Sequence, residues 1–138
     1  MREIDEIIIH CTATPAGRDV SANDIDKWHR QRGFDCIGYH YVVRLDGSIQ
    51  VGRPLDKVGA HCKGHNAHSI GIVYVGGIDE NGQYADTRTA EQRCTMAVLI
   101  SFLVRSFSTI KTIHGHRDHA ARACPCFDAH KEYQVYVK

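Results

Sequence analysis

Histidine and cysteine are crowded into the stretch from residue 114 to residue 126, HGHRDHAARACPC. It holds three histidines, two cysteines and two arginines within thirteen positions. Imidazole nitrogen and thiolate sulfur are the ligands that zinc prefers, and a catalytic zinc site needs only three protein ligands beside an open position. This stretch can supply two of them, so we expect the third to come from a distant segment.

The spacing of the candidate ligands leaves alternatives open. His10 ends the first predicted strand and is the distant candidate, while Cys124 lies eight residues beyond His116. Alternate residues of a strand point to the same side, so His114 rivals His116 as a ligand or as its supporting partner. Cys126 rivals Cys124, although one intervening residue is tighter than the usual spacing in structural zinc sites. Spacing alone does not decide between these candidates.

Strands that alternate with two helices must position these side chains. Apolar runs and turn signals predict strands at 4–10, 38–45, 48–52, 70–75 and 111–113. Ser21 and Thr89 each begin a capped helix, and the second helix is apolar almost all round, so we expect it to be largely buried. A short terminal helix is expected from Asp128. This order predicts one α/β domain over 1–138, with a central mixed β-sheet flanked by helices.

Composition excludes several classes of protein. The chain has 138 residues, of which 43% are hydrophobic and 24% charged, as in soluble globular domains. A formal net charge of +1 gives no support for a nucleic-acid partner. No apolar run is long enough for membrane insertion, and the acidic N-terminus is not a signal peptide. We therefore expect synthesis in the cytoplasm, with the six cysteines reduced or bound to metal.

Five short motifs occur in series along the chain: IHCTAT at 9–14, GYHY at 38–41, SIGI at 69–72, VGG at 75–77, and the segment 116–125. In this order and spacing, the sequence resembles the zinc-dependent N-acetylmuramoyl-L-alanine amidases. It is most similar to the short phage lysozymes of amidase type, which are related to the peptidoglycan recognition proteins. The resemblance extends from about residue 4 to residue 128 and implies their α/β fold.

The resemblance also implies roles for particular residues. It puts one Zn²⁺ on His10, His116 and Cys124, and it makes Tyr39 the catalytic tyrosine. Relatives commonly have lysine two residues before the cysteine, where this chain has Arg122. Arginine can stabilise an oxyanion as lysine does, but it is never deprotonated and cannot shuttle a proton.

The segment AHCKGHN at 60–66, within the long connection after the predicted strand 48–52, resembles the segment that lines the family's substrate groove. We expect His61 and Asn66 to contact substrate there. For the other histidines of this connection, His65 and His68, and for His119, we expect positions facing solvent.

The implied reaction is zinc-dependent hydrolysis of the amide between N-acetylmuramic acid and L-alanine in bacterial peptidoglycan. The enzyme is expected to act as a monomer and to reach the wall through a pore-forming helper. The alternative is a peptidoglycan receptor without catalysis, but such relatives lack the cysteine ligand that Cys124 provides. A purely structural zinc would need four protein ligands.

Overall fold

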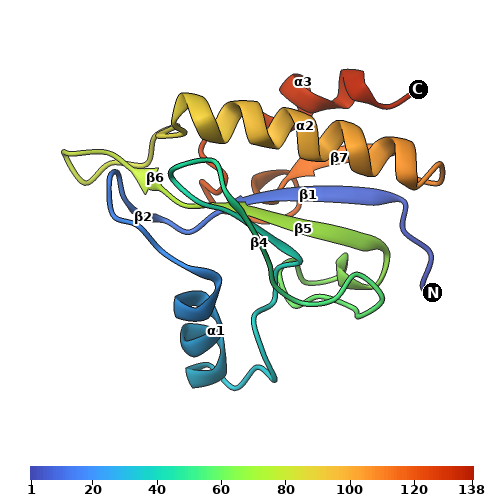
Figure 1. Ribbon diagram of the computed structural model, residues 1–138, viewed down its shortest axis with the longest axis horizontal. Helices are drawn as coiled ribbons and strands as arrows, with labels where there is room; N and C mark the ends of the chain where they lie inside the picture. The colour runs from blue at the N-terminus through green and yellow to red at the C-terminus, as the bar shows by residue number, and fades with distance from the viewer.

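A five-stranded sheet forms the centre of the computed structural model, which describes all of residues 1–138 (Figure 1). The strands are β1 (Glu6–Cys11), β3 (Tyr41–Val43), β4 (Ile49–Val51), β5 (Ser69–Tyr74) and β7 (Thr112–Gly115), in the order β4-β3-β5-β1-β7. β1 runs parallel to both β5 and β7, and β3 runs parallel to β5. The β3–β4 hairpin is antiparallel. The mixed sheet predicted from the sequence is thereby confirmed.

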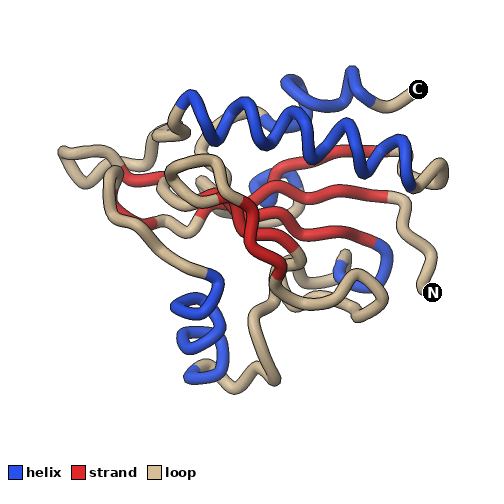
Figure 2. Tube along the Cα trace, viewed as in Figure 1, coloured by secondary structure: helices blue, strands red, loops and turns tan.

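Helices lie on both sides of this sheet (Figure 2). They are α1 (Ala22–Gln31), α2 (Ala90–Ser106) and α3 (Ala129–Tyr133). Capping boxes begin α1 at Ser21 and α2 at Thr89, as predicted. The remaining elements are the short parallel pair β2 (Thr14–Pro15) and β6 (Gly77–Ile78), and the 3₁₀ turns η1 (Asn66–His68), η2 (His116–Asp118) and η3 (Gln134–Tyr136).

The main core lies between the sheet and α2. Ile7 and Ile9 of β1 and Ile72 of β5 point into it, and all three are fully buried. Burial of each such side chain stabilises the fold by about 1.5–3 kcal/mol. A smaller cluster lies on the other face of the sheet, where Ile25 of α1 packs near Val73 of β5. α1 and the connecting loops therefore cover the second face.

Alternation along β1 sets which residues occupy this second face. Ile7 and Ile9 face the main core, so Glu6, Ile8 and His10 point to the opposite side. Glu6 lies at the amino end of β1 and His10 near its carboxyl end, roughly 13 Å apart at 3.3 Å per residue. Two polar side chains at opposite ends of one buried strand thus share a face.

The prediction that α2 is largely buried is wrong. Met96, Ile100 and Leu103 are fully buried against the sheet, but Val98 is 66% exposed and Phe102 57% exposed. Only one side of α2 contacts the sheet, and no further element covers its outer side. Apolar composition alone therefore overstated the burial of this helix.

Candidate metal centre

The structure brings His10, His116 and Cys124 together at the carboxyl ends of β1 and β7. Their candidate ligand atoms all lie within 4.8 Å of one another. His10 Nδ1 is 3.9 Å from Cys124 Sγ, and the rings of His10 and His116 have centroids 4.6 Å apart. A tetrahedral zinc separates a nitrogen from a sulfur ligand by about 3.5 Å, given bonds of about 2.0 and 2.3 Å. The three groups therefore fit zinc in chemistry and in spacing.

A second imidazole fixes the orientation of His10. His61 Nδ1 lies 2.8 Å from His10 Nε2, and its own Nε2 lies 3.3 Å from Ser69 Oγ. Gly71 makes room for this ring, because a Cβ there would come within 2.6 Å of His61 Cδ2. The bond occupies Nε2 of His10 and leaves Nδ1 on the side of Cys124. Such outer hydrogen bonds commonly orient metal-binding histidines.

Burial keeps these imidazoles neutral. It is the largest cause that holds the pKa of His10 and of His61 well below the ordinary value, and neighbouring imidazoles add to the effect. Burial also lowers the pKa of His116, with a contribution from the charge of Arg122. Neutral imidazole is the form that binds a metal ion.

Cys124 is held in place by its neighbours along the loop. Its carbonyl accepts a hydrogen bond of 2.8 Å from the amide of Arg117, and the hydroxyl of Tyr74 donates to the carbonyl of Pro125 at 2.7 Å. Gly115 lets Pro125 approach β7 closely, because a Cβ at Gly115 would lie 2.7 Å from Pro125 Cδ. The loop is thereby fastened to the strand that leads to His116.

The surroundings of Cys124 favour its thiolate. Hydrogen bonds from Cys11 lower the pKa of the Cys124 thiol, and one of them comes from the Cys11 amide at 3.2 Å. The thiolate is the form that binds metal. Cys126 lies outside the group, 3.4 Å from the carbonyl of Gly77, and burial raises the pKa of its thiol to about 12. His114 also lies outside, with Nδ1 3.0 Å from Asp118 Oδ2.

His116 and Cys124 line a groove of about 820 Å³, and His10, which is buried, lies against His116. Tyr39 lines the groove with its ring centroid 5.0 Å from that of His10, and burial raises the pKa of its hydroxyl. Arg122 is exposed and also lines the groove. Both residues thus line the same groove as His116 and Cys124. Their catalytic roles stay predictions.

The predicted substrate contacts, His61 and Asn66, also line the groove. His61, however, is buried and already bonded to His10. Asn66 Oδ1 accepts hydrogen bonds of 2.9 Å from the amides of His61 and Cys62, so it shapes the loop. Contact of either side chain with substrate stays a prediction, and each has a supporting role besides.

Sequence reasoning missed His29 of α1. Its Nδ1 accepts a hydrogen bond of 2.8 Å from the amide of Gly38, and burial lowers its pKa to about 4. The ring lies against Tyr39, with centroids 5.3 Å apart, and lines the groove. The available signal was its spacing four residues after Ile25, which puts both on the inner side of α1.

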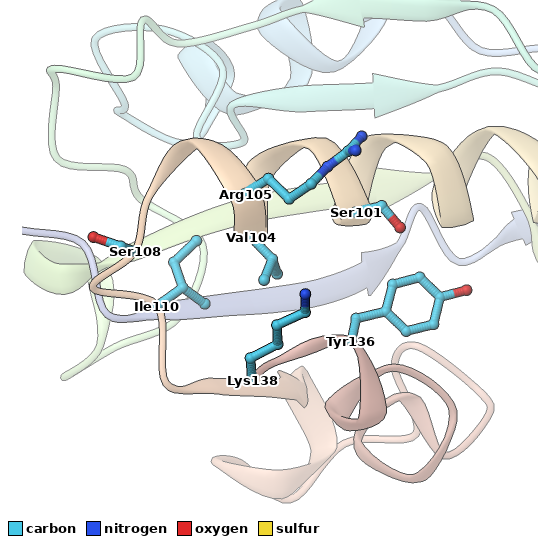
Figure 3. A pocket seen from close by; sticks show the side chains of 7 residues that line it. All are labelled: Ser101, Val104, Arg105, Ser108, Ile110, Tyr136 and Lys138. Atoms are coloured by element: carbon cyan, nitrogen blue, oxygen red, sulfur yellow. The ribbon is translucent and has the colours of Figure 1, made fainter.

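A second hollow lies on the other side of the sheet, between the end of α2 and the C-terminus (Figure 3). Arg105 and Lys138 border it, and Val104, Ile110 and Tyr136 supply apolar surface. It contains no histidine, cysteine or carboxylate. Its lining therefore differs from that of the groove, which contains His116 and Cys124.

Comparison with known proteins agrees with this geometry. The family model described as N-acetylmuramoyl-L-alanine amidase matches residues 1–127. The endolysin of Klebsiella phage KP32 is 38% identical over 128 residues, which cover 92% of this chain and 83% of that protein. The endolysin of Escherichia phage T7 is 35% identical over 125 residues, covering 90% and 82%.

Solved structures give the same result. The amidase LysC of Clostridium intestinale URNW superimposes with a TM-score of 0.82 at 31% identity, covering 99% of this chain and 88% of that one. The ectodomain complex of the peptidoglycan recognition proteins LCa and LCx, bound to tracheal cytotoxin, gives 0.78 at 27% identity, with coverage of 95% and 81%. From the fold, the grouped residues and these matches together, the chain belongs to the N-acetylmuramoyl-L-alanine amidase family.

Proposed function

We propose that the protein is a zinc-dependent, endolysin-like amidase that cleaves the bond between N-acetylmuramic acid and L-alanine in bacterial peptidoglycan. The observation that carries this proposal is the set of His10, His116 and Cys124, of which His116 and Cys124 line the groove. Three ligands leave a position for water or substrate, as catalytic zinc sites require. The enzyme acts as a monomer, is made in the cytoplasm, and reaches the wall through a pore-forming helper.

His10, His116 and Cys124 would hold the ion. Zinc bound there supplies a Lewis acid that polarises the amide carbonyl and makes water nucleophilic near neutral pH. His61 keeps the ring of His10 in one orientation. Tyr39 has a raised pKa and stays protonated, so its hydroxyl donates a hydrogen bond to the carbonyl oxygen as negative charge develops. Arg122 stabilises the same charge without exchanging a proton.

The charge of the groove suits the peptide stem. Arg32, Lys63 and Arg122 line it, and no aspartate or glutamate does. Peptidoglycan stems carry free carboxylates, which these cations attract. Phe34 and Tyr39 offer apolar surface for the rest of the stem. The residues proposed to bind the stem peptide and those proposed to act on its amide bond thus line the same groove.

Digestion of purified peptidoglycan tests the proposal. The zinc-loaded protein is expected to release free stem peptides that begin with L-alanine and to leave glycan strands intact, as mass spectrometry would show. Chelated protein should release neither, and added Zn²⁺ should restore the release. Binding to peptidoglycan without release by the loaded protein would favour the receptor, and cleavage within the glycan would contradict the bond assignment.

Replacement of Arg122 tests how it acts. Arg122→Lys should keep kcat within a few-fold of wild type, because a positive charge remains at the same place. Arg122→Ala should lower kcat by about 10²-fold, the usual effect of removing one group that stabilises an oxyanion. Steady-state release of stem peptides gives both values. A rise in KM alone for Arg122→Ala would show instead that Arg122 only binds substrate.

A further inference from the structure

A second group of metal-binding side chains surrounds Glu6, at the other end of the strand that carries His10. Glu6 is only 4% exposed. His65, His68 and His119 are within ion-pair distance of its carboxylate, and no lysine or arginine pairs with it. A buried carboxylate is unfavourable unless it is paired, hydrogen-bonded or bound to a metal. The partners that this chain offers are imidazoles, which are themselves metal ligands.

We propose that Glu6, His65 and His68 bind a second divalent cation of the zinc type. Their candidate ligand atoms lie within 4.8 Å of one another. His65 Nδ1 is 3.4 Å from Glu6 Oε1, and His68 Nδ1 is 3.8 Å from the same oxygen. A tetrahedral ion with bonds of about 2.0–2.1 Å separates two of its ligands by about 3.4 Å. The spacing of these atoms therefore suits one bound ion.

The buried ring nitrogen of His65 is an independent observation. His65 Nδ1 is shielded from solvent and has no hydrogen-bond partner, although Glu6 Oε1 is only 3.4 Å away. The two atoms are close but not aligned for a hydrogen bond. The ring is fixed by a stack on His119, with centroids 3.7 Å apart and an interplanar angle of 14°. A cation beside both atoms satisfies the nitrogen and neutralises the carboxylate.

Two other histidines near Glu6 fit an ion less well. His114 and His119 form a rival group with the same carboxylate. His119 Nε2, however, is 2.6 Å from Glu6 Oε2, a closed hydrogen bond with no space for an ion between the two atoms. His114 Nδ1 is engaged by Asp118 at 3.0 Å, and His68 Nδ1 is engaged in the same way by Asp5 at 2.7 Å, a contact that a bound ion would replace. The bond from His119 occupies Glu6 Oε2, so the free Glu6 Oε1 and the unpartnered Nδ1 of His65 are the features that favour the group of His65 and His68.

The position of the group indicates what the ion would do. His65 and His68 lie at the end of the loop that carries the groove residues Lys63 and Asn66. Glu6 belongs to the rigid central strand. An ion between them fastens this wall of the groove to the sheet. The site does not contain Cys124 and is independent of the proposed reaction.

Metal titration tests this inference. After chelator treatment, the wild-type protein is expected to bind two equivalents of Zn²⁺ by calorimetry and by elemental analysis after desalting. Cys124→Ala, which removes a ligand of the first site, should still bind one equivalent of Zn²⁺ at Glu6. His65→Asn/His68→Asn, in which both changed side chains are partly exposed, should bind one, as should the buried variant Glu6→Gln if it folds. Binding of one equivalent by the wild type would overturn the proposal.

Cobalt distinguishes the two sites. Co²⁺ at His10, His116 and Cys124 has a thiolate charge-transfer band, whereas Co²⁺ at Glu6 has none. His65→Asn/His68→Asn should therefore keep the full band while losing one equivalent. The matched control is His114→Asn, which changes a histidine of the rival group but leaves Glu6, His65 and His119 in place, and it should keep both equivalents. Loss of an equivalent in this control, but not in His65→Asn/His68→Asn, would assign the ion to the rival pair and refute the proposed ligands.

Discussion

His116→Ala is expected to abolish hydrolysis of peptidoglycan and to remove the thiolate band of the cobalt-loaded protein. The substitution leaves only His10 and Cys124 of the proposed ligands. A metal ion that polarises a carbonyl contributes several kcal/mol to the stabilisation of a transition state. At about 1.4 kcal/mol for each power of ten, its loss lowers kcat/KM by about 10³-fold or more. Release of stem peptides and cobalt absorption measure the two effects.

His114→Ala is the matched control, because His114 lies two residues earlier and its ring points elsewhere. It makes its hydrogen bond with Asp118, outside the group of His10 and Cys124. We expect its activity to stay within a few-fold of wild type. Full activity in His116→Ala would refute the ligand assignment, and so would equal loss in both variants if both remain folded.

The elements that the sequence predicted best are those with strong local signals. The isoleucine run of β1, the turn between the predicted strands 38–45 and 48–52, and the two capping boxes each determine structure over a few residues. The extent of burial of α2 was not predictable in this way. It depends on how many elements reach a helix, and that number follows from the whole topology.

The choice of metal ligands was likewise not predictable from local sequence signals. The residues alone could not choose between His114 and His116, because the choice depends on where β7 ends. His114 stays in the strand, while His116 begins η2 and thereby lies beside His10. The resemblance to a family named His10, His116 and Cys124, the group whose side chains the structure brings together, since it carries three-dimensional information that spacing lacks.

Glu6 was not predictable as a site. An acidic residue before an apolar strand ordinarily begins the strand at the surface. Here β5 and β7 flank it on both sides, pairing Glu6 with Ser69 and Thr112. Histidines from two distant loops then cover it. His65, His68 and His119, which we expected to face solvent, are each only partly exposed around its carboxylate. Long-range pairing, which no local pattern encodes, makes this carboxylate buried.

A buried arginine holds the segment before α2 to the C-terminal helix. The Arg88 side chain is fully buried and pairs with Asp86 at 2.9 Å and Glu132 at 2.8 Å. It also donates to the hydroxyl of Tyr133 at 2.8 Å and lies 3.5 Å from the ring centroid of Phe127. Phe127 and α3 directly follow the loop of Cys124. The pairing therefore supports one end of the metal centre.

Asp86→Asn/Glu132→Gln is expected to destabilise the fold by about 3–5 kcal/mol, the cost of leaving a buried charge without a partner. Arg88→Met should cost less, about 1–2 kcal/mol, because the two carboxylates it leaves are partly exposed and can be hydrated, while methionine fills the space. Urea unfolding followed by circular dichroism measures both free energies. A larger loss in Arg88→Met than in the double variant would contradict this reasoning.

Acid unfolding of the wild type and of Asp86→Asn/Glu132→Gln separates the contribution of the Arg88 ion pairs to stability from that of side-chain packing. Hydrogen bonds from Arg88 lower the pKa of Glu132. Burial raises the pKa of Asp86, but hydrogen bonds from Arg88 outweigh burial, so the pKa of Asp86 is also below its ordinary value. A carboxylate with a lowered folded pKa adds stability above its unfolded pKa of about 4, and this is lost as the pH falls through the folded value. The wild type should therefore lose stability steeply below about pH 4. In Asp86→Asn/Glu132→Gln this part of the slope should vanish, because neither side chain titrates. An unchanged slope would show that other carboxylates govern acid unfolding and that the Arg88 pairs contribute through packing alone.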